Sequence, residues 1–197
     1  MSKINKIAGV DEVGRGCLAG PVFSAAVILN EKINTKDIKD SKKISFKKII
    51  LLSKYIKKNS IYAIGIATVN EIDKINILNA SLLSMQRALN KLKLKPSIAY
   101  IDGLFAPKGE KIKYKTVIRG DEKITSVAAA SIVAKVSRDL FMIKLAKKYP
   151  KYNWHKNFGY GTADHLNRIK KHGITKHHRK KFKPIHNMLS HTTRETQ

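Results

Sequence analysis

Residues 7–22 read IAGVDEVGRGCLAGPV, and this stretch decides the fold. An apolar run ends in Asp11 and Glu12, and we expect a strand over residues 6–13. A glycine-rich turn follows over residues 14–21, and residues 22–29 form a second apolar run of strand length. The chain is therefore expected to begin with two strands joined by a turn that permits close approach of another molecule.

Regular elements continue along the rest of the chain. The pattern predicts a helix that begins after an N-cap at Ser45, and a later helix that stops before Pro96. The expected strands lie at 61–69, 97–101 and 112–118, and the expected helices at 46–58, 78–94, 126–148 and 163–172. Early strands followed by alternating helices and strands indicate an α/β fold, a mixed sheet flanked by helices.

Length and charge restrict the class of protein. The chain has 197 residues, which suggests one domain, placed at 1–191 with its basic helical segment from about 150, before a polar tail at 192–197. With 40 Lys and Arg against 14 Asp and Glu, the net charge of +26 attracts polyanions, nucleic acid first and an anionic membrane surface second. A membrane partner is disfavoured because no run approaches ~20 apolar residues and no basic helix carries aromatic anchors.

Targeting signals and disulfides are not expected. Cys17 is the single cysteine, which rules out a disulfide framework, and no cleavable signal peptide is recognisable. We therefore expect a cytoplasmic monomer that meets nucleic acid.

Basic residues concentrate in the last quarter of the sequence. All seven histidines follow residue 150, and from 151 to 191 ten Lys or Arg accompany one acid, Asp164. A zinc site at His177, His178 and His186 is the less favoured interpretation, because no cysteine is near and the spacing fits no common ligand pattern. We expect these histidines on a polar surface or against phosphate.

Four acids occupy unusual places. Asp11, Glu12 and Asp102 end apolar strands, and Asp121 follows another strand. A carboxylate at such a position loses water on one side, and strand ends are where α/β sheets bind ligands. Oxygen ligands without His or Cys suit Mg²⁺ or Mn²⁺, and two such ions can support phosphodiester cleavage. The alternative is that each acid caps a loop or pairs with a lysine. Asp139, four residues after Lys135, is explained by a helix salt bridge and is the reserve ligand.

An ordered set of motifs resembles ribonuclease HII. The set runs from residue 7 to about 186 and consists of DEVGRG at 11–16, LAGPV at 18–22, DSKK at 40–43, IDG at 101–103, GD at 120–121, AAASIVAKVSRD at 128–139, GYGT at 159–162 and HR at 178–179. The resemblance implies a ribonuclease H-like fold, a five-stranded mixed sheet with flanking helices and a C-terminal helical segment.

The same resemblance implies an activity and a metal site. It implies cleavage of the RNA strand of RNA–DNA hybrids, and cleavage 5′ of single ribonucleotides within duplex DNA, leaving 5′-phosphate and 3′-hydroxyl ends. It carries the ligands of two Mg²⁺ or Mn²⁺ ions, which are also the catalytic residues, onto four acids: Asp11, Glu12, Asp102 and Asp121.

Substrate-binding residues also follow from the resemblance. Recognition of the ribose 2′-hydroxyl, which distinguishes RNA from DNA, falls on one turn and one aromatic ring. Apart from the resemblance, phosphate contacts are expected from Lys42, Lys43 and the basic residues after 150, with Arg179 among the substrate-binding residues. The full set is Gly14, Arg15, Gly16, Tyr160, Lys42, Lys43 and Arg179.

Three positions depart from the family pattern. Cys17 stands where proline is usual, Phe158 where lysine is common, and Lys181 where serine is usual. None is one of the four acids, so the departures bear on substrate affinity and not on the chemistry.

Three rival functions remain open. A non-catalytic RNA-binding protein of ribosomal type fits the composition but gives no reason for acids at strand ends, and mutating them should then leave function intact. Another metal nuclease of the same fold, transposase-like or specific for Holliday junctions, would prefer an all-DNA substrate. A ribonuclease HIII fits less well, because that group carries an extra N-terminal domain and only about six residues precede the first strand.

Overall fold

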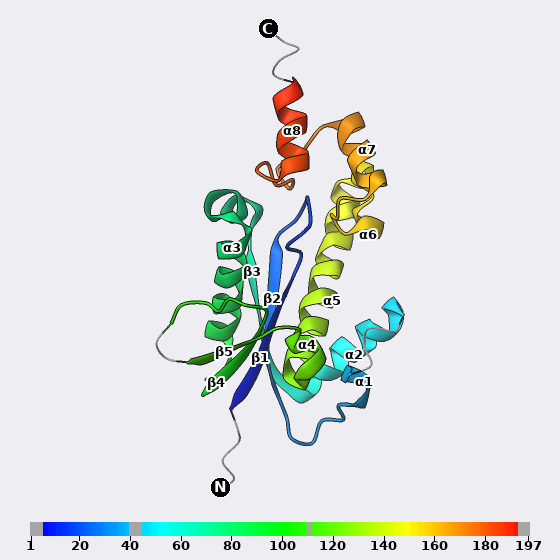
Figure 1. The fold of residues 1–197 in the computed structure, drawn as a ribbon. Coiled ribbons are helices and arrows are strands. Elements are labelled where there is room, and N and C mark those ends of the chain that lie inside the picture. Colours follow the sequence, from blue (N-terminus) through cyan, green and yellow to red (C-terminus); the bar gives the residue numbers. More distant parts are fainter. Residues whose placement is uncertain (1–5, 40–44, 110–111, 193–197) are drawn as a thin grey trace.

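A five-stranded mixed sheet forms the centre of the computed structural model (Figure 1), which describes residues 6–39, 45–109 and 112–192. The sheet order is β3-β2-β1-β4-β5. β2 runs antiparallel to β1 and β3, whereas β1, β4 and β5 are mutually parallel. The strands are β1 (Ile7–Val13), β2 (Val22–Leu29), β3 (Ser60–Ala67), β4 (Ile98–Asp102) and β5 (Lys113–Val117). The expected fold class is confirmed.

The parallel strands fix where the acids lie. Val10 of β1 stands beside Ile101 of β4, so Asp11 and Asp102 each come one residue later on neighbouring strands. Asp102 in turn pairs with Val117, the last residue of β5. The carboxyl ends of these three strands therefore meet at one edge of the sheet.

Helices cover both faces of the sheet. α3 (Val69–Lys91) packs on one face, and α5 (Thr125–Lys148) with α2 (Phe46–Asn59) packs on the other (Figure 1). α5 approaches β1 very closely, because a Cβ built on Gly9 would lie 2.0 Å from the backbone carbon of Ser126. β1, the strand that carries Asp11 and Glu12, is thus packed directly against the backbone of α5.

Helix starts follow local capping. Ser45 accepts a hydrogen bond from the Lys48 N–H, as expected for the N-cap of α2. α3 begins nine residues before the expected position, at a capping box in which Thr68 and Glu71 satisfy each other's backbone N–H groups. Asn76, with φ of 66°, interrupts this helix, which is why the apolar pattern predicted only its second part.

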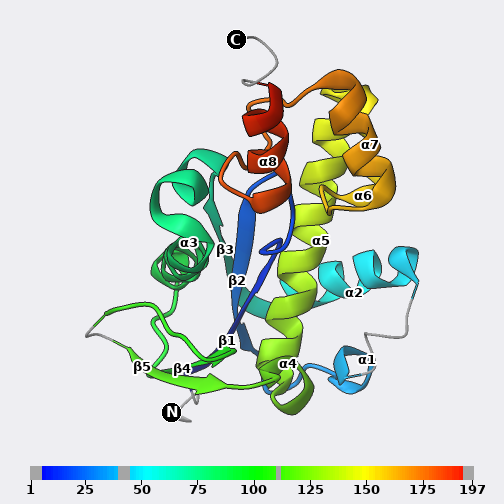
Figure 2. The same ribbon diagram turned by 45° about the horizontal axis from the view of Figure 1, so that its top comes forward.

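The C-terminal segment packs against the distal part of α5 (Figure 2). Its elements are η2 (Pro150–Tyr152), α6 (Trp154–Asn157), α7 (Ala163–His172) and α8 (Lys183–Thr192). The sequence predicted α7 with the observed bounds. It did not predict α6, α8 or the two short helices α1 (Lys36–Lys39) and α4 (Gly120–Lys123). Trp154 is the fully buried centre of this segment.

Two expectations concern residues without a described position. The basic pair Lys42 and Lys43 lies in 40–44, and residues 193–197 of the expected tail also lie outside the described residues. Thr192, the first residue of that tail, is instead the last residue of α8. Across the described ranges, none of the helices has the length and apolar character needed to cross a membrane.

Candidate active site

Acids carried by two neighbouring strands, and by the short helix that follows the next strand, gather at one edge of the sheet. Asp11 and Glu12 lie near the end of β1, and Asp102 is the last residue of β4. Asp121 lies in the first turn of α4, which follows β5. All four predicted acids are therefore placed by the ends of the three parallel strands.

Asp11 is the most buried of the four, with 6% of its surface exposed. One carboxylate oxygen accepts the Glu12 backbone N–H at 2.7 Å, and Ser131 of α5 supplies a side-chain hydrogen bond. Burial raises the pKa of Asp11 well above its ordinary value, and repulsion from Glu12 and Asp102 raises it further. A positive charge bound beside Asp11 would therefore stabilise the ionised form of its carboxylate.

Glu12 is only partly neutralised by its neighbour. Arg15 donates to Glu12 Oε1 at 3.0 Å, yet burial still raises the pKa of Glu12. The other oxygen, Oε2, is buried and accepts no hydrogen bond from the described residues. A buried carboxylate oxygen without a donor is one that a cation can satisfy.

Asp102 connects the sheet to the fourth acid. Its Oδ1 accepts the Gly120 N–H at 2.7 Å, which ties the end of β4 to the start of α4. Asp121 is the next residue and is partly buried. This bond holds the turn that carries Asp121 against the end of β4.

The donor set fits a hard divalent cation. Within the described ranges, no three Asp, Glu, His or Cys side chains already converge on a single point as metal ligands. Instead, local donors hold Asp11, Glu12 and Asp102, and two of these acids have raised pKa values. The unpartnered Glu12 oxygen and the mutual repulsion are both relieved by a cation that prefers oxygen ligands.

The predicted ribose-sensing groups lie side by side. Cys17 and Tyr160 form an isolated antiparallel bridge, so the turn at residues 14–16 borders the segment that carries Tyr160. A Cβ on Gly16 would meet no atom within 4 Å, and Tyr160 is 41% exposed. The turn and the aromatic ring are therefore both open to a ligand at neighbouring positions.

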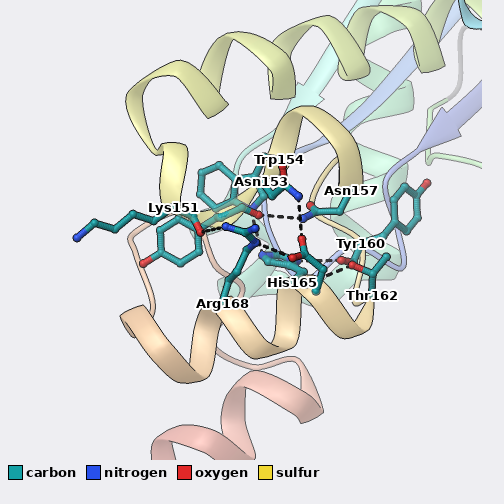
Figure 3. A network of polar contacts seen from close by, with 10 residues as sticks. Lys151, Asn153, Trp154, Asn157, Tyr160, Thr162, His165 and Arg168 are labelled. Carbon is teal, nitrogen blue, oxygen red and sulfur yellow. Dashed lines mark hydrogen bonds and ion pairs between the residues drawn. The ribbon is translucent and has the colours of Figure 1, made fainter.

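A buried polar network holds the backbone of Tyr160 (Figure 3). The Tyr160 N–H donates to Asn157 O at 2.9 Å, and the Tyr160 carbonyl lies 2.8 Å from His165 Nδ1. Trp154 Nε1 donates to His165 Nε2 at 3.0 Å, so His165 carries its proton on Nδ1 and donates to Tyr160. Sequence reasoning missed His165, because nothing in the spacing showed that it is fully buried.

His178 continues this network. The Thr175 N–H donates to His178 Nδ1 at 2.9 Å, which places the His178 proton on Nε2, 3.3 Å from His165 Nε2. Burial lowers the pKa of His178 to about 4, and the neighbouring His165 adds to this shift. The expectation that His178 lies on a polar surface is wrong, because the side chain is only 1% exposed.

Arg179 is not placed to touch phosphate. Its side chain is fully buried, and its described hydrogen bonds go to the carbonyls of Gly14, Arg15 and Gly20. The expected direct contact between Arg179 and substrate is therefore wrong, and the residue supports the turn from inside.

The remaining singled-out residues have local roles. Asp139 pairs with Lys135 at 2.8 Å, which confirms the helix salt bridge. Cys17 is fully buried and hydrogen-bonds with Tyr160. Phe158 has φ of 49° and packs beside Phe46.

Known proteins resemble this chain over nearly its whole length. The family model described as Ribonuclease HII matches residues 8–185. A Ribonuclease HII of Pelagibacter ubique is 58% identical over 183 residues, covering 93% of this chain and 98% of that protein. The solved ribonuclease H2 from Pyrococcus horikoshii superposes with a TM-score of 0.79 at 27% identity, covering 95% of this chain and 98% of that one.

A more distant structure shares the fold alone. Bst-RNase HIII, solved in complex with Mn²⁺, superposes with a TM-score of 0.72 at 16% identity. The match covers 98% of this chain and 72% of that one.

Proposed function

This chain belongs to the ribonuclease HII family, and from that premise we propose that it cleaves the RNA strand of RNA–DNA hybrids and cuts 5′ of single ribonucleotides in duplex DNA. The observation that carries the proposal is the gathering of strand-end acids beside the 14–16 turn and Tyr160. A non-catalytic RNA-binding protein would have no use for buried acids with raised pKa values. The family match argues against the other nucleases, including ribonuclease HIII.

Asp11, Glu12, Asp102 and Asp121 are the proposed ligands of two divalent ions, Mg²⁺ or Mn²⁺. Such ions, when bound, lower the pKa of water and stabilise the leaving oxygen of a phosphodiester. The Mn²⁺ complex of a ribonuclease HIII with the same fold supports this choice of metal. Glu12 Oε2 is the oxygen best suited to a first contact, because it is buried without a donor.

The protein's own groups orient these acids. The Glu12 N–H and Ser131 fix the Asp11 carboxylate, and the Gly120 N–H fixes that of Asp102. Arg15 balances the charge of Glu12 from the exposed side. A carboxylate already held by such donors loses little further freedom when it binds a cation. The proposed products are a 5′-phosphate and a 3′-hydroxyl.

Recognition of ribose is proposed for the backbone of Gly14, Arg15 and Gly16 and for the ring and hydroxyl of Tyr160. The carbonyls of Gly14 and Arg15 are already engaged by Arg179, so the N–H side of the turn is available to a ligand. Lys42, Lys43 and the basic surface after residue 150 are the proposed phosphate contacts, which position a duplex without reading its sequence. A cytoplasmic monomer remains the expected state.

Cleavage of matched duplexes tests the function. The substrates are an RNA–DNA hybrid, a DNA duplex with one ribonucleotide and the same duplex of DNA alone, each with Mg²⁺ or Mn²⁺. The wild-type chain should cut the first two and spare the third. Asp102→Asn should retain binding and lose most turnover. Equal metal-dependent cleavage by this variant and the wild type would defeat the assignment of Asp102.

A further inference from the structure

We propose that Arg138 and Arg179 are positioning residues that orient the peptide groups of the 14–16 turn so that their N–H groups face the ribose. The inference deepens the proposed function and rests on it. Both side chains are fully buried, and both come from parts of the chain far from the turn in sequence.

Arg179 holds the turn from one side with four hydrogen bonds. Nη2 donates to Gly14 O at 2.6 Å and to Gly20 O at 2.8 Å, while Nε donates to Gly20 O at 3.0 Å. Nη1 donates to Arg15 O at 2.8 Å. One guanidinium thus fixes the beginning and the end of the loop together.

Arg138 holds the same loop from the side of α5. It donates to the carbonyls of Ala19 and Pro21, each at 3.0 Å, and to Phe158 O at 2.9 Å. Phe158 precedes the Gly159–Tyr160 pair, so this arginine joins the turn to the segment that carries Tyr160. A Cβ on Gly14 would lie 2.2 Å from Arg138 Nε, and Gly14 has φ of 94°, so only glycine fits there.

The direction of these bonds determines which groups meet the substrate. In a trans peptide, the N–H of one residue points away from the carbonyl of the residue before it. Because Arg179 draws the carbonyls of Gly14 and Arg15 inward, the N–H groups of Arg15 and Gly16 are directed outward. These two donors are then fixed in place before a 2′-hydroxyl arrives.

The chemistry of arginine suits this task. Burying a cation that has carbonyl partners instead of a carboxylate is costly, so stability alone gives little reason to place two such side chains here. Burial lowers the pKa of Arg179 to about 10, which leaves it charged at neutral pH. The planar guanidinium offers five donors in a fixed fork, which lysine cannot reproduce.

Lysine substitutions test the proposal, because they keep the charge and remove the fork. Arg179→Lys and Arg138→Lys are compared with the wild type and with Arg87→Lys. Arg87 is the matched control, since it donates to Ile66 O at 2.7 Å and to Glu71 on α3, outside the proposed site. Each protein is assayed for kcat/KM on a duplex with one ribonucleotide, and for Kd on the all-DNA duplex over a range of salt.

The expected result separates positioning from phosphate contact. The two variants should lose roughly tenfold to a hundredfold in kcat/KM, the size of effect that follows a misplacement of about 1 Å. Their Kd for all-DNA duplex and its salt dependence should equal those of Arg87→Lys. A salt slope reduced by about 0.9 would instead indicate a lost phosphate contact and would overturn the proposal. A lower melting temperature with unchanged kcat/KM would also overturn it.

A measurement on the unaltered chain covers the case in which neither lysine variant folds. The N–H groups of Leu18, Ala19 and Gly20 bond to Gly159 and His177, and in a fixed turn they should exchange hydrogen as slowly as those of β1. Exchange as fast as in the loop at 103–109 would refute a fixed turn. If the wild type cleaves neither ribonucleotide substrate, the proposed function fails, a result distinct from any of these.

Discussion

Replacing Gly9 by alanine tests how the packing of α5 on β1 supports the site. The added Cβ would lie 2.0 Å from Ser126 C and 2.2 Å from Val127 N, both of them backbone atoms that cannot rotate away. Since ordinary contact begins near 3.4 Å, the start of α5 must withdraw by roughly 1.4 Å. We expect a loss of about 2 kcal/mol in the free energy of unfolding.

The displacement should also reduce catalysis. α5 carries Ser131, which hydrogen-bonds Asp11, so its withdrawal moves a donor away from the proposed metal ligand. An error of about 1 Å in such a position can cost roughly a hundredfold in rate. Thermal unfolding should show a melting temperature lower by roughly 4–8 °C, and kcat on a single-ribonucleotide duplex should fall at temperatures where the variant remains folded.

Gly16→Ala is the matched control for stability. A Cβ at Gly16 meets nothing within 4 Å, so this variant should melt with the wild type even though it alters the proposed ribose site. The reasoning is refuted if Gly9→Ala melts with the wild type and keeps its kcat, because the close contact between α5 and β1 would then have no consequence.

Three further predictions concern charge. Because the pKa of His178 in the folded chain is about 4, below its ordinary value, the free energy of unfolding should fall by up to about 3 kcal/mol as pH falls from about 6.5 to 4. Denaturant titrations at several pH values measure this loss, and His178→Gln should make the free energy of unfolding less dependent on pH over the same range. Asp11→Asn should unfold at higher denaturant than the wild type at pH 7 in a chelator, because it removes a buried charge whose pKa is raised, and it should abolish cleavage; equal or lower stability would contradict the repulsion argued for the acids. The logarithm of duplex affinity should fall linearly with the logarithm of salt concentration, by about 0.9 per neutralised phosphate, and affinity independent of salt would contradict a basic binding surface.

The sequence predicted the structure best where the pattern of apolar residues allows only one type of secondary structure. β2 and α7 have the predicted bounds, because a run of almost entirely apolar residues and a capped, periodic segment each have one stable local form. The acids could be found for a related reason, since a carboxylate that ends an apolar strand stands out in a chain with few acids. Their common edge follows from the parallel strands.

The interior was harder to predict from sequence. Arg179 and His178 lie in a basic segment and were assigned to the surface, yet both are buried by contacts with residues more than 150 positions earlier. Arg138 carries no local sign of its function, because its partners come from two distant stretches of chain, residues 19–21 and residue 158. The composition gives the net charge of the chain, but it does not indicate which charged side chains become buried when the chain folds.

Two contacts between the ends of the chain have a consequence for biosynthesis: the backbone bridge between Ala19 and His178, and the hydrogen bond from Arg179 to the Gly14 carbonyl. A nascent chain that has emerged only as far as the end of α5 already contains all four acids, the turn and Arg138, but it lacks Arg179, the second residue that holds the turn. Premature termination or proteolysis before residue 178 should therefore yield a fragment that has the acids, the turn and Tyr160 but lacks Arg179, and this fragment should discriminate less well between ribose and deoxyribose. Selectivity is completed last, when the final third of the polypeptide folds back onto the first.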